Sequence, residues 1–311
     1  MNLNTKNKPL VEAGLIAAMA TIFVLVTIFI PVLTILVFIL PVAFIILGIR
    51  YPIRYTVLSL ITVCIITGFF TEVVYSLFLF VIFGPIAIVM SYLMSKKRNE
   101  FEVIIAGTIA ASVSWFIAIH IISIVSGINI LDQIAYIFKE SIYAQLDMLN
   151  QMNLNSELRI NEAINYFISI FPALIIIQSM IVSVINYYLS ISVLRRTNQY
   201  AGTTPTFSSF KLPKHIIMGF FLLSALAYLS QYVQGIYYEN LLHNITALFM
   251  FLLFLQGISV VLYFMEKSNL NKVFKVFILV VVILMRTFLT FVALAGFIDA
   301  IFNVRKFNKG Q

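Results

Sequence analysis

Long runs of apolar residues, separated by short polar segments, follow one another along almost the whole chain. A helix needs about 20 apolar residues to cross a bilayer, and most of these runs approach that length. Because peptide groups inside a bilayer must hydrogen-bond within the protein, each run is predicted to be helical. The pattern predicts an all-α integral membrane protein, a polytopic bundle of about nine apolar segments with roughly 8–10 spans. The segments are Leu10–Ile30, Pro31–Ile49, Tyr55–Phe70, Val73–Met94, Val103–Val125, Ala163–Leu194, His215–Val233, Leu241–Met265 and Val273–Ile301.

The composition excludes most other classes of protein. Of the 311 residues, 62% are hydrophobic and 10% are charged, whereas soluble domains carry about 45–50% and about 25%. So few charges cannot cover a water-soluble particle, which argues against a soluble enzyme, a secreted disulfide module and a disordered chain. Cys64, the single cysteine, lies in an apolar run and is expected to be a small buried side chain.

The basic residues predict the orientation of the spans. Lys6 and Lys8 favour a cytoplasmic N-terminus, with the spans in the plasma membrane. With that orientation, Lys139 and Arg159 are the only basic residues of the outside loops. The net charge of +8 is therefore a topology signal, and the expected partner is the lipid bilayer rather than nucleic acid. The basic residues assigned to the inside are Lys6, Lys8, Arg50, Arg54, Lys96, Lys97, Arg98, Arg195, Arg196, Lys211, Lys214, Lys267, Lys272 and Lys275.

Two polar connections divide the chain. Residues 127–162 form an outside segment whose apolar residues recur at helical spacing, which predicts an amphipathic helix. Residues 196–214 hold Gly, Pro, Ser and Thr and are predicted to be a cytoplasmic linker. The predicted parts are a six-helix unit over 1–195, this linker, and C-terminal membrane helices with a basic tail over 215–311.

The last apolar stretch allows two topologies. Residues 273–301 are interrupted by Arg286 and followed by Arg305, Lys306 and Lys309. The positive-inside rule favours a re-entrant hairpin, which returns this basic tail to the cytoplasm. A single tilted span with an exported tail is the alternative.

Polar and aromatic side chains gather near the outer ends of the fourth to sixth helices. Small-molecule sites combine apolar and aromatic walls with a few polar groups, so these residues are candidate ligand-binding residues. Interfacial aromatic belts also place Trp and Tyr near helix ends, and a lone helical histidine is more often structural. The candidates are Glu72, Tyr75, Trp115, His120, Ser123, Tyr166 and Gln178.

Arg286 and Asp299 are candidate intramembrane charges, because such residues are costly in lipid. Arg286 is expected to anchor a helix end, and Asp299 to pair near the inner surface, for instance with Arg305 or Lys306. The chain lacks phosphate-binding, zinc-protease and nucleophile-elbow motifs, and its three histidines are scattered. No catalytic residue, metal site or cofactor is therefore expected, and the protein is not expected to be an enzyme.

The first six helices resemble the substrate-binding S components of energy-coupling factor (ECF) transporters. The resemblance rests on Glu12–Ala20, on Pro41–Gly48 followed by Arg50, on Gly84-Pro85 before Met94–Arg98, and on Ile105–Ala111. It implies that Ala13 and Ala17 dock on a coupling subunit and that an ATPase supplies energy in trans. It also implies a small-molecule ligand that binds from outside, with the amphipathic segment as a lid.

Over its whole length the chain resembles the YybS-like family of uncharacterised bacterial multi-spanning membrane proteins. This likeness rests on Gln256-Gly257, on Gly296–Asp299 and on Val304–Lys306. The chain continues for more than 100 residues beyond the sixth helix, unlike an S component. The leading hypothesis is an S-component-like subunit, and the alternative is a ligand-free scaffold or regulatory protein of the bacterial cell envelope.

We expect topology reporters to recover this orientation. A reporter fused after residue 150 should be active outside, one after residue 205 inside, and one after residue 309 inside, because basic loops stay in the cytoplasm. Alkaline phosphatase and green fluorescent protein fusions measure the two states. The reverse pattern at residues 150 and 205 would contradict the orientation.

Overall fold

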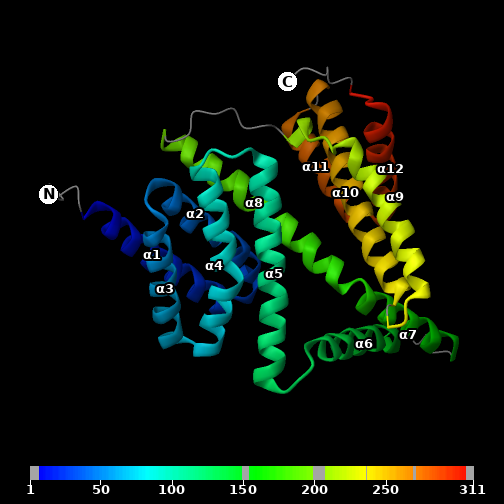
Figure 1. Cartoon of the computed structure of the whole chain (residues 1–311), viewed down its shortest axis with the longest axis horizontal. Coiled ribbons are helices and arrows are strands. Elements are labelled where there is room, and N and C mark those ends of the chain that lie inside the picture. The colour runs from blue at the N-terminus through cyan, green and yellow to red at the C-terminus, as the bar shows by residue number, and fades with distance from the viewer. Residues whose placement is uncertain (1–6, 149–153, 199–206, 236, 269–270, 306–311) are drawn as a thin grey trace. The chain divides into compact units, whose positions relative to one another are not determined.

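The computed structural model describes residues 7–148, 154–198, 207–235, 237–268 and 271–305. Within these residues the chain forms helices joined by short turns, and no strand occurs (Figure 1). Eight helices of the described part are long and apolar enough to cross a membrane. The predicted all-α polytopic fold is thereby confirmed. The chain divides into two compact units, residues 1–143 with 175–202 and residues 144–174 with 203–311.

Unit 1 is built around one central helix, α4. This helix packs against α2, α3 and α5, while α1 packs against α3. Its elements are α1 (Lys8–Phe29), η1 (Pro31–Ile39), α2 (Pro41–Arg50), α3 (Ile53–Phe70), α4 (Val73–Ser95) and α5 (Glu100–Ser126). Most of α6 (Ile130–Met148) and most of α8 (Phe171–Arg196) complete the unit.

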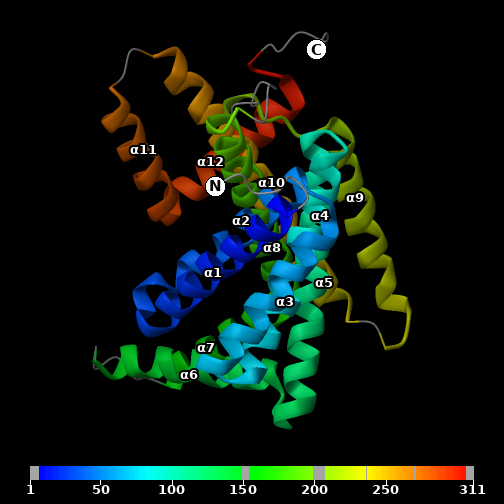
Figure 2. The same cartoon turned by 90° about the vertical axis from the view of Figure 1, so that its left-hand side faces the viewer.

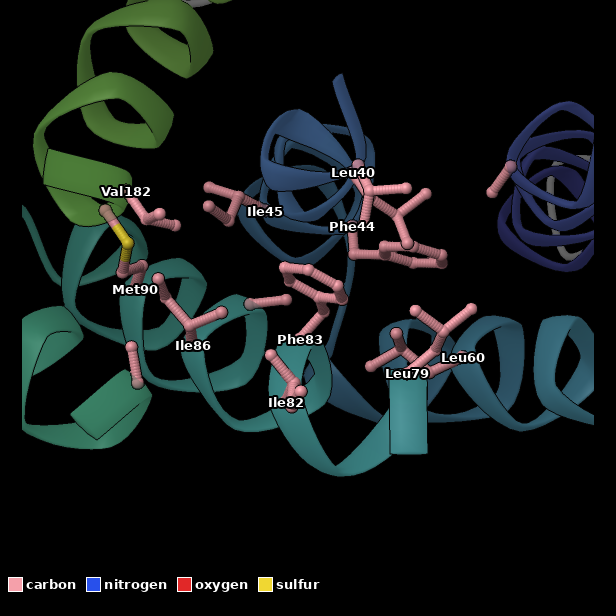
Figure 3. Close-up of a cluster of buried hydrophobic side chains, with 14 of the residues drawn as sticks. Leu40, Phe44, Ile45, Leu60, Leu79, Ile82, Phe83, Ile86, Met90 and Val182 are labelled. Atoms are coloured by element: carbon pink, nitrogen blue, oxygen red, sulfur yellow. The ribbon is translucent and has the colours of Figure 1, made fainter. Parts of the chain in front are cut away.

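The core of unit 1 lies where α2, α3, α4 and α8 meet (Figure 3). Phe44 and Ile45 are fully buried, and Phe83 of α4 packs beside them. Met90 of α4 and Val182 of α8 extend the same cluster. Hydrocarbon surrounds a membrane protein, so close van der Waals packing, more than exclusion from water, holds these helices together.

The segment predicted as one helix over Pro31–Ile49 is two elements. Residues 31–39 form a 3-10 helix, and α2 begins only at Pro41. Proline has no N–H and its ring hinders the preceding turn, so each helix begins with a proline. A 3-10 helix of nine residues is unusually long, since most run for three or four.

Unit 2 is built around the 30-residue helix α10 (Tyr238–Lys267). This helix packs against α7, η2, α9 and α12. The other elements are α7 (Leu154–Ser169), η2 (Phe207–Ser209), α9 (Lys214–Leu229), η3 (Ser230–Tyr232), α11 (Lys272–Leu284) and α12 (Arg286–Phe302). Phe249 and Leu253 of α10 and Ala293 of α12 are buried at its centre.

The last apolar stretch is a hairpin of two short helices (Figure 2). The break falls at Met285, whose backbone is extended. With 13 residues, α11 is about 20 Å long, too short for a hydrocarbon core of about 30 Å. After α12, Arg305 bonds to Ser208 and Ser259 near the end of unit 2 where α10 finishes. Helix α11 therefore begins, and helix α12 finishes, at the same end of unit 2. The alternative of a single tilted span is wrong.

The division into units differs from the predicted boundary at residue 195. Residues 144–174 belong with the C-terminal helices. The side chain of Asn244 on α10 explains this, because it donates to the carbonyl of Ser169 and accepts from the N–H of Ala173. The predicted span Ala163–Leu194 is likewise two helices, α7 and α8, separated at Ile170.

Two glycines allow α10 and α12 to touch through their backbones. A Cβ atom on Gly257 would overlap the carbonyl of Val292, and one on Gly296 would overlap the carbonyl of Leu253. We expect Gly257→Ala and Gly296→Ala each to lower the stability by about 1–3 kcal/mol or more, as overpacking does. Thermal unfolding of the purified protein in detergent measures the effect.

Gly219 of α9 provides the matched control, because a Cβ there meets nothing within 4 Å. Gly219→Ala should leave the melting temperature unchanged or raise it, since alanine favours a helix more than glycine does. Equal losses in all three variants would contradict the backbone contact.

Candidate functional site

Three of the seven predicted ligand-binding residues, Glu72, His120 and Ser123, lie in or near the two turns at one end of unit 1, called here the distal end. The turns are the α3–α4 turn at residues 71–72 and the α5–α6 turn at residues 127–129 (Figure 1). Glu72 is exposed at the first turn, immediately before α4. At the second turn Gly127 adopts a positive φ of 67°, which glycine tolerates without strain.

A hollow of about 500 Å³ opens beside the α5–α6 turn. His120 and Ser123, two of the predicted residues, lie in its wall with Asn129. The Oγ of Ser123 accepts a hydrogen bond from the N–H of Ile130 at 3.5 Å, and Asn129 Oδ1 accepts from Leu131 at 3.1 Å. The α5–α6 hollow is lined by Phe116, Ile119, His120, Ser123, Gly127, Ile128, Asn129 and Leu131.

The lining of the α5–α6 hollow suits binding rather than catalysis. Apolar walls with a few polar groups are typical of small-molecule sites. His120 is the single titratable side chain among the lining residues, so no second acid or base is present there to share a proton transfer. Among the described residues, no three His, Cys, Asp or Glu side chains lie together as metal ligands would.

Tyr75 and Trp115 do not line this hollow. Both are half-buried and pack on the core of unit 1. The indole ring of Trp115 meets the ring of Phe78 edge to face, with centroids 5.9 Å apart. The structure brings His120 and Ser123, but not Trp115, to the hollow, because α5 ends and the chain turns just beyond the first two residues.

Gln178 and Tyr166 do not line the α5–α6 hollow either. Gln178 is half-buried on α8 and is not among the lining residues. Tyr166 is on α7 in unit 2, where its ring meets that of His243 at 5.0 Å. The Oγ of Ser169 lies 3.0 Å from Nδ1 of the same histidine. The seven predicted residues therefore do not form one cluster in unit 1.

Ala13 and Ala17 are internal packing residues. Each is only 1% exposed, and the hydroxyl of Ser59 on α3 donates to the carbonyl of Ala13 at 2.9 Å. Their small side chains let α1 and α3 approach closely. The burial of both side chains argues against the docking role that the resemblance implied for these two residues.

Glu12 is also satisfied within unit 1. Its carboxylate accepts a hydrogen bond from the hydroxyl of Tyr51 at 2.8 Å and lies 3.4 Å from the guanidinium of Arg50. Burial and the neighbouring Glu12 raise the pKa of Tyr51 above its ordinary value. This cluster ties the beginning of α1 to the α2–α3 turn.

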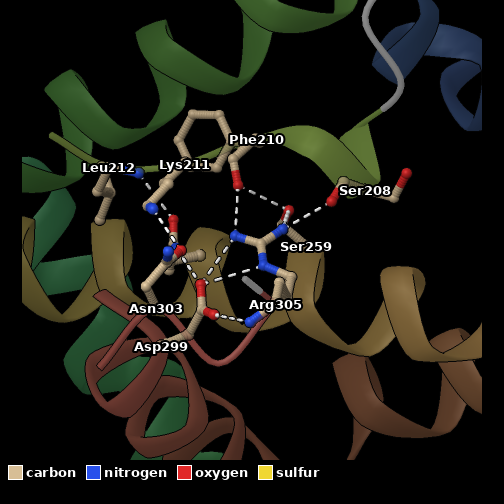
Figure 4. Close-up of polar contacts among 9 residues, drawn as sticks. Ser208, Phe210, Lys211, Leu212, Ser259, Asp299, Asn303 and Arg305 are labelled. Carbon is tan, nitrogen blue, oxygen red and sulfur yellow. Dashed lines mark hydrogen bonds and ion pairs between the residues drawn. The ribbon is translucent and has the colours of Figure 1, made fainter. Parts of the chain in front are cut away.

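A buried ion pair forms the second polar site of the chain, in unit 2 (Figure 4). Arg305 donates to the carboxylate of Asp299 at 2.9 and 3.1 Å, and neither side chain is more than 1% exposed. The guanidinium also donates to the carbonyl oxygens of Ser208 and Phe210 and to the hydroxyl of Ser259. Of the two partners predicted for Asp299, Arg305 and Lys306, the structure shows the pairing with Arg305.

Gln256 links this ion pair to the segment before α9. Its amide nitrogen donates to Asp299, and its amide oxygen accepts from the N–H of Leu212 at 2.8 Å. Lys211 bonds to Asn303 beside them. The cluster therefore fastens residues 207–212 to α10 and to the end of α12, and we call it the Arg305 clamp.

Sequence reasoning missed Gln256 and Ser259 as parts of this clamp. The available signal was their polarity within an otherwise apolar span of α10. Arg286, the other predicted intramembrane charge, is the first residue of α12, and its side chain lies outside the described part of the structure.

Apolar helices of spanning length, with their buried charges paired inside the protein, define a multi-spanning helical membrane protein. Residues 18–300 match the model of the family described as "Predicted membrane protein (DUF2232)", and the chain belongs to this family. It is 23% identical over 311 residues to "Uncharacterized protein YybS" of Bacillus subtilis (strain 168), which covers 96% of this chain and 98% of that protein. No solved structure matches the chain.

We expect Arg305→Met to destabilise the protein strongly. The change leaves the buried carboxylate of Asp299 without its cation, and breaking a buried ion pair costs about 3–5 kcal/mol. The double variant Arg305→Met/Asp299→Leu should recover part of this loss, because it removes both charges. Thermal unfolding measures all the variants.

Arg98→Met is the matched control, since Arg98 pairs with Glu102 at an exposed site. Exposed ion pairs contribute little, so the melting temperature should hardly change. If Arg305→Met behaved like this control, the clamp would not hold unit 2 together.

Proposed function

We propose that this protein is a substrate-binding membrane subunit without enzymatic activity, similar in role to an S component. The observation that carries the proposal is the α5–α6 hollow, where His120, Ser123 and Asn129 face a space among apolar walls. Its volume of about 500 Å³ is that of a typical small-molecule site. The ligand would be a small molecule that binds between apolar surfaces and a few hydrogen-bonding groups.

The proposed orientation puts this hollow on the outside of the plasma membrane and the N-terminus in the cytoplasm. Basic residues support it, because they gather at the end of unit 1 opposite the distal end, on the α2–α3 turn, the α4–α5 turn and the end of α8. The distal turns carry Glu72 and no Lys or Arg. The basic residues are Arg50, Arg54, Lys96, Lys97, Arg98, Arg195 and Arg196.

Energy for transport would come from an ATPase or coupling subunit in trans. The support is the sequence itself, which has no phosphate-binding loop. Since Ala13 and Ala17 are buried, such a partner would have to use a different surface. The partners proposed are therefore the bilayer, a small molecule and a separate energising subunit.

A ligand-free scaffold is the second candidate. The observation that favours it is α6, an amphipathic helix too polar to count among the spans. It exposes the apolar side chains of Leu131, Tyr136 and Ile137. An amphipathic helix of this kind can dock in an apolar groove of a partner protein.

We expect the small-molecule fraction of a cell extract to raise the melting temperature of the purified protein, because a ligand that binds the folded state stabilises it. His120→Ala and Ser123→Ala should each weaken this effect about two- to tenfold, since one neutral hydrogen bond contributes about 0.5–1.5 kcal/mol. Thermal shift titrations with the active fraction measure the change.

Ser141→Ala is the control, because Ser141 lies on α6 away from the hollow and its hydroxyl bonds to Ile137 of the same helix. It should leave the ligand effect unchanged. The absence of any stabilising fraction, together with a partner protein that co-purifies through α6, would favour the scaffold.

A further inference from the structure

Four polar side chains lie on one buried face of α8. Ser179, Ser183, Asn186 and Ser190 are spaced by four, three and four residues, which places them on the same side of a helix. Each of the four is 0% exposed. We call them the α8 polar stripe.

The α8 polar stripe faces other elements of unit 1. The Oγ of Ser183 lies beside Gly107 of α5, at 3.1 Å from where a Cβ of that glycine would be. Asn186 donates its side-chain N–H to the carbonyl of Phe38 in η1 at 2.8 Å. The stripe therefore lies against α5 and the long 3-10 helix.

The oxygen atoms of the stripe have no hydrogen-bond partner. This holds for the Oγ atoms of the three serines and for Oδ1 of Asn186. Several other buried hydroxyls in unit 1 behave differently, since those of Thr21, Thr67 and Ser112 bond to a carbonyl of their own helix. A helical serine can usually make this bond. Thr56 of α3 is a further buried hydroxyl without a partner, but it stands alone and not in a row.

Unpartnered oxygens are costly in this position. The hydrocarbon core holds no water that could replace a missing hydrogen-bond partner. A buried polar group there therefore needs a partner from the protein or from a bound molecule. The 3-10 helix η1, which lies beside the stripe, is also consistent with a binding site. Backbone that is not α-helical occurs at membrane depth where it is buried in protein or lines a cavity. Asn186 donates across the interface to Phe38, whereas the three serine hydroxyls and the amide oxygen of Asn186 are left for a bound molecule.

We propose that the α8 polar stripe, with η1 and Gly107 opposite, is a membrane-embedded binding site for a small uncharged molecule that carries hydroxyl or amide groups. Hydroxyl and amide groups both donate and accept, so they match a ligand of the same chemistry. No titratable side chain belongs to the stripe, and a charged ligand would be left without a counter-charge. The stripe shares no residue with the α5–α6 hollow, so this site does not depend on the proposed outer site.

Substituted cysteines test the site, since Cys64 is the single cysteine of the chain. In a Cys64→Ala background, Ser183→Cys and Ser190→Cys are introduced separately and membranes are treated with 2-hydroxyethyl methanethiosulfonate. This reagent is small, uncharged and hydroxylated, like the ligand inferred. We expect both cysteines to be modified completely under conditions that leave the Ser112→Cys control unmodified, because Ser112 is buried on α5 and does not belong to the stripe.

A cationic reagent, 2-(trimethylammonium)ethyl methanethiosulfonate, tests the chemical class. It should fail to modify Ser183→Cys and Ser190→Cys. Equal modification by both reagents would overturn the assignment to uncharged ligands. Resistance of both cysteines to the uncharged reagent, as in the control, would overturn the site itself.

Alanine variants give a readout that does not need a reagent. Ser183→Ala and Ser190→Ala remove hydroxyls that make no bond, so the melting temperature of the purified protein should stay the same or rise. Ser112→Ala should lower it, because a bonded hydroxyl is lost. A loss at Ser183 and Ser190 as large as at Ser112 would overturn the proposal, since it would show ordinary structural hydrogen bonds.

Discussion

Polar groups inside a bilayer have no water to bond with, and this constraint shapes every part of the protein. It makes each long apolar run a helix, because a helix satisfies its own peptide groups. It also explains why the buried hydroxyls of Thr21, Thr67 and Ser112 bond to their own helices. Arg305 can be buried only because Asp299, two backbone carbonyls and a serine hydroxyl surround its guanidinium.

In unit 2 this constraint determines the path of the chain. The Arg305 clamp brings the end of α12 to residues 207–212, and α11 and α12 can then be a hairpin whose two ends lie together. The crossing of α10 and α12 at Gly257 and Gly296 holds the same helices through backbone contact. Burial of apolar side chains would not by itself favour this arrangement over exposure of the same side chains to lipid, since lipid is as apolar as the helix surfaces.

Unit 1 combines a well-packed core with two places where polar side chains gather among apolar ones. One is the α5–α6 hollow at the distal end, and the other is the α8 polar stripe. The hollow is open, whereas the stripe is fully buried, so α8 must separate from α5 or η1 before a molecule can reach it. A long 3-10 helix is a suitable wall for such a movement, because its hydrogen bonds are weaker than those of an α-helix.

The sequence by itself determined the class and the number of apolar helices to within one or two, and it limited the partner of Asp299 to Arg305 or Lys306. These features depend on the length of each apolar run and on charges that are close in the sequence. The breaks at Ile170 and Met285 and the burial of Ala13 and Ala17 were decided only by the tertiary structure. Apolar and small residues look alike on every face of a membrane helix, so the pattern cannot tell which face meets lipid and which meets another helix. For the same reason the spacing of Ser179, Ser183, Asn186 and Ser190 was visible in the sequence, but only the fold turned that face inward and left its oxygens without partners.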